Sequence, residues 1–369
     1  MLTANKGEWS ELYVLLHILG TGIVHAADGL LNTLPTFYHV VKVVREEKGI
    51  GSKAREIEYH ISKDIVSIID NGITVDVIPC LDFIKAAKIL FDAIKSGPPP
   101  GFKGAFPIPE VTEFLYRCQC FTTKAKSSDK ADISVVIFDT HTESEILLKF
   151  SIKSEAGNKS SLLNASSLTN MFYTVEGLID QKTADEINNI SSKDKVVERI
   201  RAIQNKGLTM RFYGFSSTVF ENNLRMIDCK LPEIIGHMVL DGYINGKDIS
   251  KVIKSITTCN PFNFDSSMGH DFYGYKIKSF LIATALGMKP SQVWNGQYEA
   301  TGGYIIVKNN GEIVCFHMYD RNQLEEYLIS NTKFETPSSD PNKIKGTRYI
   351  VYKENDTWFF NLNLQIRFK

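Results

Sequence analysis

One pattern of alternating residues constrains the fold of this chain most strongly. Apolar and β-branched side chains alternate with polar ones over residues 132–139 and again over 145–153, and the link between them is polar. A period of two predicts two strands, and the short polar link predicts that they pair as an antiparallel hairpin. Asp132, which opens the first strand, would then lie beside Lys153, which closes the second. The same period places Ser151 on the same face of the sheet as Lys153.

The composition is that of a globular protein with enough apolar residues for a large core. A chain of 369 residues can form one elaborated domain or two to three smaller ones. No apolar run is long enough to span a bilayer and residues 1–10 do not resemble a secretion signal, so we expect no membrane anchor and a cytoplasmic location. The cysteines lack zinc-type spacing and are expected to be reduced. Basic and acidic residues balance at 42 each, so DNA binding would require a local basic surface.

Helical and strand patterns follow one another irregularly, which predicts an α/β protein of the α+β type. Residues 7–19 and 81–95 have helical periodicity, and two strands near residue 70 are joined by Asn71-Gly72, a strong hairpin signal. The proline- and glycine-rich segment 96–101 must end the second helix. We therefore expect three regions. They are an N-terminal helix and β-hairpin region at 1–100, a central region at 101–258 that contains the Asp132 hairpin, and a C-terminal region at 259–369.

Several segments share their order and spacing with one known family. They are Asn5–Tyr13, Lys124–Ile133, Phe150–Ser154, Ser161–Ser166, Gly302–Val307, Gly311–His317 and Asn363–Phe368. Together they resemble HpaII-type type II restriction endonucleases, nearly from end to end. The resemblance implies a PD-(D/E)xK-like nuclease core at 101–258, with a mixed central sheet flanked by helices. It also implies a C-terminal region that supports DNA recognition.

The same resemblance implies an activity and partners. The expected reaction is Mg²⁺-dependent cleavage of both strands of double-stranded DNA at a short palindromic site of the CCGG type. A palindromic site favours a homodimer, because each subunit can then cut one strand. Enzymes of this family normally accompany a DNA methyltransferase that protects the same site, so we expect such a functional pairing.

Asp132 and Lys153 suit the chemistry of phosphodiester hydrolysis. Carboxylates hold hard Mg²⁺, and a lysine can orient the attacking water and offset the developing negative charge. The PD-(D/E)xK pattern usually has an acid two residues before the lysine, whereas this chain has Ser151, a poor metal ligand. The alternative interpretation is a capping acid and a surface lysine at the ends of two strands.

A second metal-binding carboxylate must therefore come from elsewhere in the chain. Glu155 lies two residues past Lys153 on the same strand face, and Glu113 lies on an expected short helix at 109–118. We rank these two glutamates equally as candidates to bind the metal together with Asp132. Glu11, on the N-terminal helix, ranks behind them as a further catalytic candidate. For each glutamate, a side chain that simply faces solvent is the alternative.

Basic and polar residues in several regions are candidates for DNA contacts, because Arg and Lys bind phosphates and read guanine. The candidates are Lys124, Lys126, Lys130, Asn164, Arg211, Lys276, Lys278 and Arg321. The lysines also suit a solvated face, and Asn164 suits a helix cap. We expect a type II restriction endonuclease, with a catalytically silent or structure-specific DNA-binding protein of the same fold as the alternative.

Overall fold

A computed structural model of the chain describes residues 2–48, 54–123, 131–140, 142–157, 159–338, 344 and 346–369. The chain separates into two compact units. The first contains residues 1–160 and 298–327, and the second contains residues 161–297 and 328–369. Helices occur with mixed sheets, which confirms the expected α+β class. None of the described helices is both long and apolar enough to cross a membrane.

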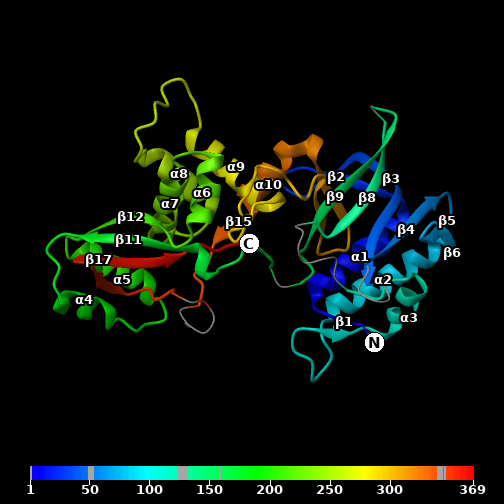
Figure 1. Cartoon of the computed structure of the whole chain (residues 1–369), viewed down its shortest axis with the longest axis horizontal. Coiled ribbons are helices and arrows are strands. Elements are labelled where there is room, and N and C mark those ends of the chain that lie inside the picture. The colour runs from blue at the N-terminus through cyan, green and yellow to red at the C-terminus, as the bar shows by residue number, and fades with distance from the viewer. Residues whose placement is uncertain are drawn as a thin grey trace. The chain divides into compact units, whose positions relative to one another are not determined.

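A nine-stranded mixed sheet forms the centre of the first unit (Figure 1). Its strand order is β2-β14-β13-β9-β8-β3-β4-β5-β6, and β2 also pairs with β3, so the first six strands of this order form a closed ring. Pairing is parallel for β9 with β13 and for β2 with β14. The strands are β2 (Ile23–Ala27), β3 (Thr33–Lys48), β4 (Ala54–Ser62), β5 (Ile65–Asp70), β6 (Ile73–Pro79), β8 (Ile133–Asp139), β9 (Ser144–Ser154), β13 (Gly303–Val307) and β14 (Ile313–His317). The short strands β1 (Thr3–Ala4) and β7 (Phe106–Pro107) pair separately.

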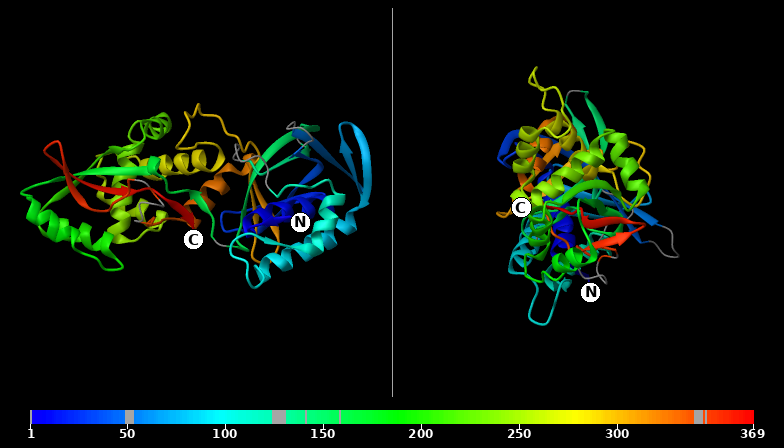
Figure 2. Two further views of the ribbon diagram at one scale, coloured as in Figure 1. Left: turned by 60° about the horizontal axis from the view of Figure 1, so that its bottom comes forward. Right: turned by 90° about the vertical axis from the view of Figure 1, so that its left-hand side faces the viewer.

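Helices α1 (Lys6–Thr21) and α2 (Cys80–Ser96) pack side by side in the core of this unit, followed by the shorter α3 (Pro109–Arg117) (Figure 2). The capping box of α1 joins the Asn5 side chain to the Glu8 backbone and the Glu8 carboxylate to the Asn5 backbone. Gly20 lets the two helices approach closely, because a Cβ there would lie 2.6 Å from the Ile84 side chain. Both helices predicted from the periodicity of residues 7–19 and 81–95 are therefore confirmed.

The two predicted hairpins are both present. Strands β5 and β6 turn through Asn71 and Gly72, whose φ angles of 49° and 79° explain the residue choice. Strands β8 and β9 pair antiparallel from Ile133 opposite Phe150 onward. Asp132 extends this ladder by one residue, because its backbone N–H donates to the Phe150 carbonyl at 2.8 Å. The strand pair therefore brings residue 132 to the end of β9, as the alternation predicts.

Two glycines allow β13 to enter the sheet beside β9. A Cβ on Gly302 would lie 2.6 Å from the Phe150 ring. Gly303 has a φ of 106°, and a Cβ on it would lie 2.0 Å from the Phe316 carbonyl oxygen. Only glycine is compatible with both approaches. The resulting register places Tyr304 next to Ser151.

The second unit contains a four-stranded antiparallel sheet of order β12-β11-β17-β16, a three-stranded sheet of order β10-β18-β15, and packed helices (Figure 2). The strands are β10 (Ser161–Leu163), β11 (Asn170–Glu176), β12 (Thr209–Phe215), β15 (Thr332–Phe334), β16 (Val351–Glu354), β17 (Thr357–Asn363) and β18 (Ile366–Phe368). The helices are α4 (Gln181–Asn188), α5 (Lys195–Asn205), α6 (Thr218–Ile227), α7 (Leu231–Asn245), α8 (Ile249–Cys259) and α9 (Phe272–Leu286). The division between the units falls within α10 (Arg321–Asn331).

These units cut across the three regions expected from the sequence. Strands from the first 100 residues, from the Asp132 hairpin and from residues 303–317 pair in one sheet, so they share one core. Residues 161–258, expected in the same region as the hairpin, belong to the second unit. The segment 96–101 is a connection between α2 and α3 within the first unit. Long-range strand pairing, which a local change in composition does not reveal, sets these boundaries.

Candidate active site

Asp132, Ser151 and Lys153 meet where β8 begins and β9 ends. Asp132 Oδ2 accepts hydrogen bonds from the Ser151 hydroxyl at 3.1 Å and from the Ile152 backbone N–H at 2.6 Å. Lys153 Nζ donates to Ser151 Oγ at 3.3 Å. The contact between Ser151 and Lys153 confirms that the two side chains share a face. One carboxylate and one ammonium are thus held together by local strand geometry.

Ser151 connects this pair to Tyr304 of β13. Ser151 is 2% exposed, and its side chain shares a hydrogen bond with the Tyr304 hydroxyl. A hydroxyl has one proton and two lone pairs. With its proton directed to Asp132, Ser151 accepts from Lys153. The Lys153 ammonium also lies 5.6 Å from the centre of the Tyr304 ring, within the range of a cation–π contact.

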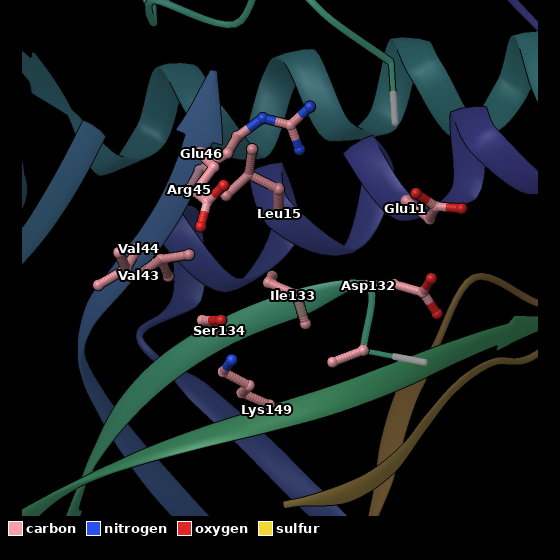
Figure 3. A pocket seen from close by; sticks show the side chains of 11 residues that line it. Glu11, Leu15, Val43, Val44, Arg45, Glu46, Asp132, Ile133, Ser134 and Lys149 are labelled. Carbon is pink, nitrogen blue, oxygen red and sulfur yellow. The ribbon is translucent and has the colours of Figure 1, made fainter. Parts of the chain in front are cut away.

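Glu11 reaches the same site from α1 (Figure 3). Burial, and then the negative charge of Asp132, raise the pKa of Glu11 to about 8, while the charges of Arg45 and Lys153 act in the opposite direction. The electrostatic coupling of Glu11 to both Asp132 and Lys153 places its carboxyl among the site residues. Glu11 therefore supplies a second acid to the site, from a position far away in the sequence.

A buried ion pair supports one wall of the site. Arg45 Nε donates to Glu47 Oε1 at 2.7 Å, with side chains that are 8% and 0% exposed. Arg45 also donates to the Thr122 carbonyl at 2.6 Å, and Glu47 Oε2 accepts from the Thr122 hydroxyl at 2.9 Å and from the Phe121 N–H at 3.2 Å. These bonds hold residues 121–122 against β3. Sequence reasoning missed this pair and also the role of Tyr304 beside Ser151.

A pocket opens next to the two acids (Figure 3). It is lined by Glu11, Leu15, Val43, Val44, Arg45, Glu46, Ala131, Asp132, Ile133, Ser134 and Lys149. These residues come from α1, from the second half of β3, from the start of β8 and from β9. Apolar and charged side chains share the wall, so the pocket is suited to a polar or charged group.

The other two acids considered for the metal site lie elsewhere. Glu155 is exposed just past the end of β9, and its charge raises the pKa of Tyr327, where burial is the larger cause. Glu113 is exposed on α3, while Val111 and Leu115 of that helix face the core. The described contacts of Asp132 include neither glutamate. The geometry favours Glu11, which the sequence ranked behind them.

The candidate DNA-binding residues have different environments. Lys124, Lys126 and Lys130 lie outside the described residues. Arg211 pairs with Glu176 at 2.7 Å, Arg321 pairs with Glu325 at 3.1 Å, and Lys276 pairs with Asp228. Lys278 is partly buried on α9. Asn164 is exposed after β10 and does not cap a helix, whereas Ser166 caps the turn at Ser167–Thr169. Arg321 belongs to the first unit and the other described candidates to the second, so the described contacts do not gather them into one surface.

The donor atoms of the site suit a hard divalent cation. Among the residues that the structure describes, no group of three or more His, Cys, Asp and Glu side chains is arranged to hold a metal ion. Asp132 and Glu11 nevertheless present two carboxylates, and Mg²⁺ commonly binds one or two carboxylates while water and substrate phosphate complete its shell. Burial, and then the charge of Asp132, raise the pKa of Glu11, and a cation bound between the two acids would favour its ionised form.

Comparisons with known proteins identify the family of the chain. The family model described as HpaII restriction endonuclease matches residues 5–368. The chain belongs to the HpaII restriction endonuclease family. It is 38% identical over 367 residues to the type II restriction enzyme HpaII of Haemophilus parainfluenzae, covering 99% of this chain and 98% of that enzyme. No solved structure matches the chain.

Membership of the HpaII restriction endonuclease family confirms the resemblance seen in the sequence. The family consists of type II restriction enzymes, which are site-specific deoxyribonucleases, so DNA is the expected partner. Enzymes of this class generally use a divalent metal, in agreement with the two carboxylates of the site. The match begins at residue 5 and therefore includes α1 with Glu11 as well as the Asp132 hairpin.

Proposed function

We propose that this protein cuts both strands of DNA at a short palindromic site of the CCGG type, in a reaction that depends on Mg²⁺. One observation carries the proposal: Asp132, Lys153 and the Glu11 carboxyl, brought together from a hairpin and a distant helix, supply the groups that phosphodiester hydrolysis needs. This arrangement supports a PD-(D/E)xK-like core in which the second acid comes from α1 rather than from the strand.

Asp132 and Glu11 would hold the metal ion. Asp132 Oδ2 is already fixed by Ser151 and by the Ile152 N–H, and no described hydrogen bond occupies Oδ1, which leaves that oxygen for a ligand. Bound at this place, Mg²⁺ supplies positive charge to the scissile phosphate and favours deprotonation of the attacking water. Two carboxylates leave coordination positions for water and for the DNA itself.

Lys153 orients the attacking water and offsets the charge that develops on the phosphate oxygens. Ser151 and Tyr304 hold the ammonium in place from two sides, one by a hydrogen bond and one by the aromatic face. In the reaction, the water oxygen forms a bond to phosphorus and the water gives up a proton to solvent. The bond from phosphorus to one ester oxygen breaks, and that leaving oxygen takes up a proton from solvent to become a hydroxyl. Ser151 acts here as a positioning residue rather than as a metal ligand.

The palindromic target implies a homodimer in which each subunit cuts one strand. A cellular role in restriction requires a DNA methyltransferase that protects the same site, and we expect one to be encoded beside this protein. We propose DNA contacts for Lys124, Lys126, Lys130, Asn164, Arg211, Lys276, Lys278 and Arg321. Of these, the three that are ion-paired in the structure would exchange a carboxylate for a phosphate.

The test is incubation with plasmid and unmethylated phage DNA, with Mg²⁺ or with a chelator, followed by sequencing of the fragment ends. Ends that share one short palindrome, produced only with the metal, support the proposal. Binding without cleavage under any divalent metal would instead favour the catalytically silent alternative. Methylation of the target should prevent cleavage.

A variant locates the chemistry. Lys153→Ala should retain DNA binding in Ca²⁺ but lose cleavage by about a hundredfold or more, the usual size of a lost charge-stabilising group. Lys88→Met is the matched control, because Lys88 is exposed on α2 and should leave cleavage unchanged. Cleavage at the wild-type rate by Lys153→Ala would show that the centre lies elsewhere.

A further inference from the structure

The pocket beside the acids contains a cross-strand pair that the proposed chemistry does not use. Ser134 of β8 lies directly opposite Lys149 of β9 in the register of the hairpin. Both side chains line the pocket that also contains Glu11 and Asp132 (Figure 3). Directly opposed residues of an antiparallel pair have Cβ atoms about 5 Å apart, so a hydroxyl and an ammonium can act on one ligand.

Lys149 differs from the ion-paired basic residues named above. In the described part of the chain, no carboxylate forms an ion pair with Lys149, and no hydrogen bond involves its ammonium or the Ser134 hydroxyl. By contrast, Arg211, Lys276 and Arg321 each have an acidic partner. Lys149 can therefore bind an anion without first breaking an ion pair.

The backbone of Lys149 is held from both sides. Its N–H donates to the Thr301 hydroxyl at 3.2 Å, and its carbonyl accepts from the Gly302 N–H at 2.8 Å. The alternation of the strand puts Lys149 on the face that carries Ser151 and Lys153. Four residues of strand separate Lys149 from Lys153, or about 13 Å between Cα atoms, so the two ammonium groups address different phosphates.

We infer that Ser134 and Lys149 form a binding site for a DNA backbone phosphate that flanks the phosphate being hydrolysed. The inference rests on the proposed nuclease function. Ser134 donates one neutral hydrogen bond and Lys149 supplies the charge, which is the usual composition of a backbone contact without base specificity. Such a contact fixes the position of the duplex on the sheet face that leads to Lys153.

The experiment measures DNA binding in Ca²⁺ by fluorescence anisotropy as a function of salt, for wild type, Lys149→Met and the control Lys88→Met. Each lost phosphate contact lowers the slope of log K against log salt by about 0.9 for duplex DNA. We expect this decrease for Lys149→Met with both specific and scrambled duplexes, and no change for Lys88→Met. Ser134→Ala should weaken binding with the slope unchanged, because the hydroxyl carries no charge.

Neutral methylphosphonate linkages, placed one at a time along the duplex, identify the phosphate. Wild type should lose affinity at one flanking position where Lys149→Met loses none. An unchanged salt slope, or equal losses in both proteins at every position, would overturn the inference. A wild type that neither binds nor cuts DNA would instead refute the proposed function, so the two failures are distinguishable.

Discussion

Replacing Glu11 by glutamine should abolish cleavage and yet make the protein less sensitive to alkaline pH. The pKa of Glu11 is about 8, because of burial and then the Asp132 charge, against an ordinary value of 4.5. The folded chain therefore keeps a proton that the unfolded chain releases between these two pH values. Stability is fully retained below pH 4.5, falls as the pH rises through this window, and is at its lowest above about 8.

The structure sets the size of the effect. The two pKa values differ by about 3.5, and each pKa unit corresponds to about 1.36 kcal/mol, which gives an upper limit of about 5 kcal/mol. Glu11 retains some exposure to solvent, and solvent screening reduces the effect, so we expect about 2–3 kcal/mol. Glutamine is similar in shape and does not titrate, so the variant lacks this loss.

Urea denaturation in EDTA, at about pH 5 and about pH 8.5, measures the difference. Glu113→Gln is the matched control, because it makes the same chemical change at an exposed position and should follow the wild type. Added Mg²⁺ at the higher pH should stabilise the wild type more than Glu11→Gln, since ligands that bind only the folded state stabilise it. An equal loss of stability between the two pH values in wild type and Glu11→Gln would refute the buried placement of the Glu11 carboxyl.

Two further variants test the surroundings of the site. Tyr304→Phe keeps the ring and removes one hydrogen bond, so single-turnover cleavage should slow by about tenfold with unchanged DNA affinity. If Tyr304 acts through Ser151, adding Tyr304→Phe to a Ser151→Ala variant should slow cleavage little further. The control Tyr59→Phe also removes a buried hydroxyl and should not affect cleavage. Glu47→Gln leaves the buried Arg45 charge without its ionic partner and should lower the free energy of unfolding by about 3 kcal/mol; a loss below about 1 kcal/mol by urea denaturation would contradict that reading.

The sequence predicted the local half of the site. Asp132, Ser151 and Lys153 lie within one hairpin, so period-two alternation was enough to place them on neighbouring strands. The same local reasoning favoured Glu155, because it continues the alternation of Lys153. However, β9 ends at Ser154, and the Glu155 side chain is exposed beyond the strand.

Glu11 could not be placed by local reasoning, because its position depends on how α1 packs against the sheet. A signal was nevertheless present in the sequence. Residues 12–16 of this helix are apolar and are all buried in the structure, so the helix has little solvent-facing surface. A carboxylate beside such a run must be desolvated, and desolvated acids are concentrated at functional sites. Local reasoning does not give the division into two units for a similar reason, since pairing of β13 with β9 joins residues far apart in the chain.

The serine at position 151 is consistent with a site whose two acids come from different elements, Asp132 from the hairpin and Glu11 from helix α1. Position 151 is buried and contacts Asp132, so an acid there would add a second negative charge next to the first. It would also remove the hydroxyl proton that orients Asp132. With the acid on α1 instead, the proposed metal site is complete only when the helix is docked on the sheet. Substitutions in the α1 core should therefore weaken cleavage before they unfold the protein, as parallel cleavage assays and urea denaturation would measure.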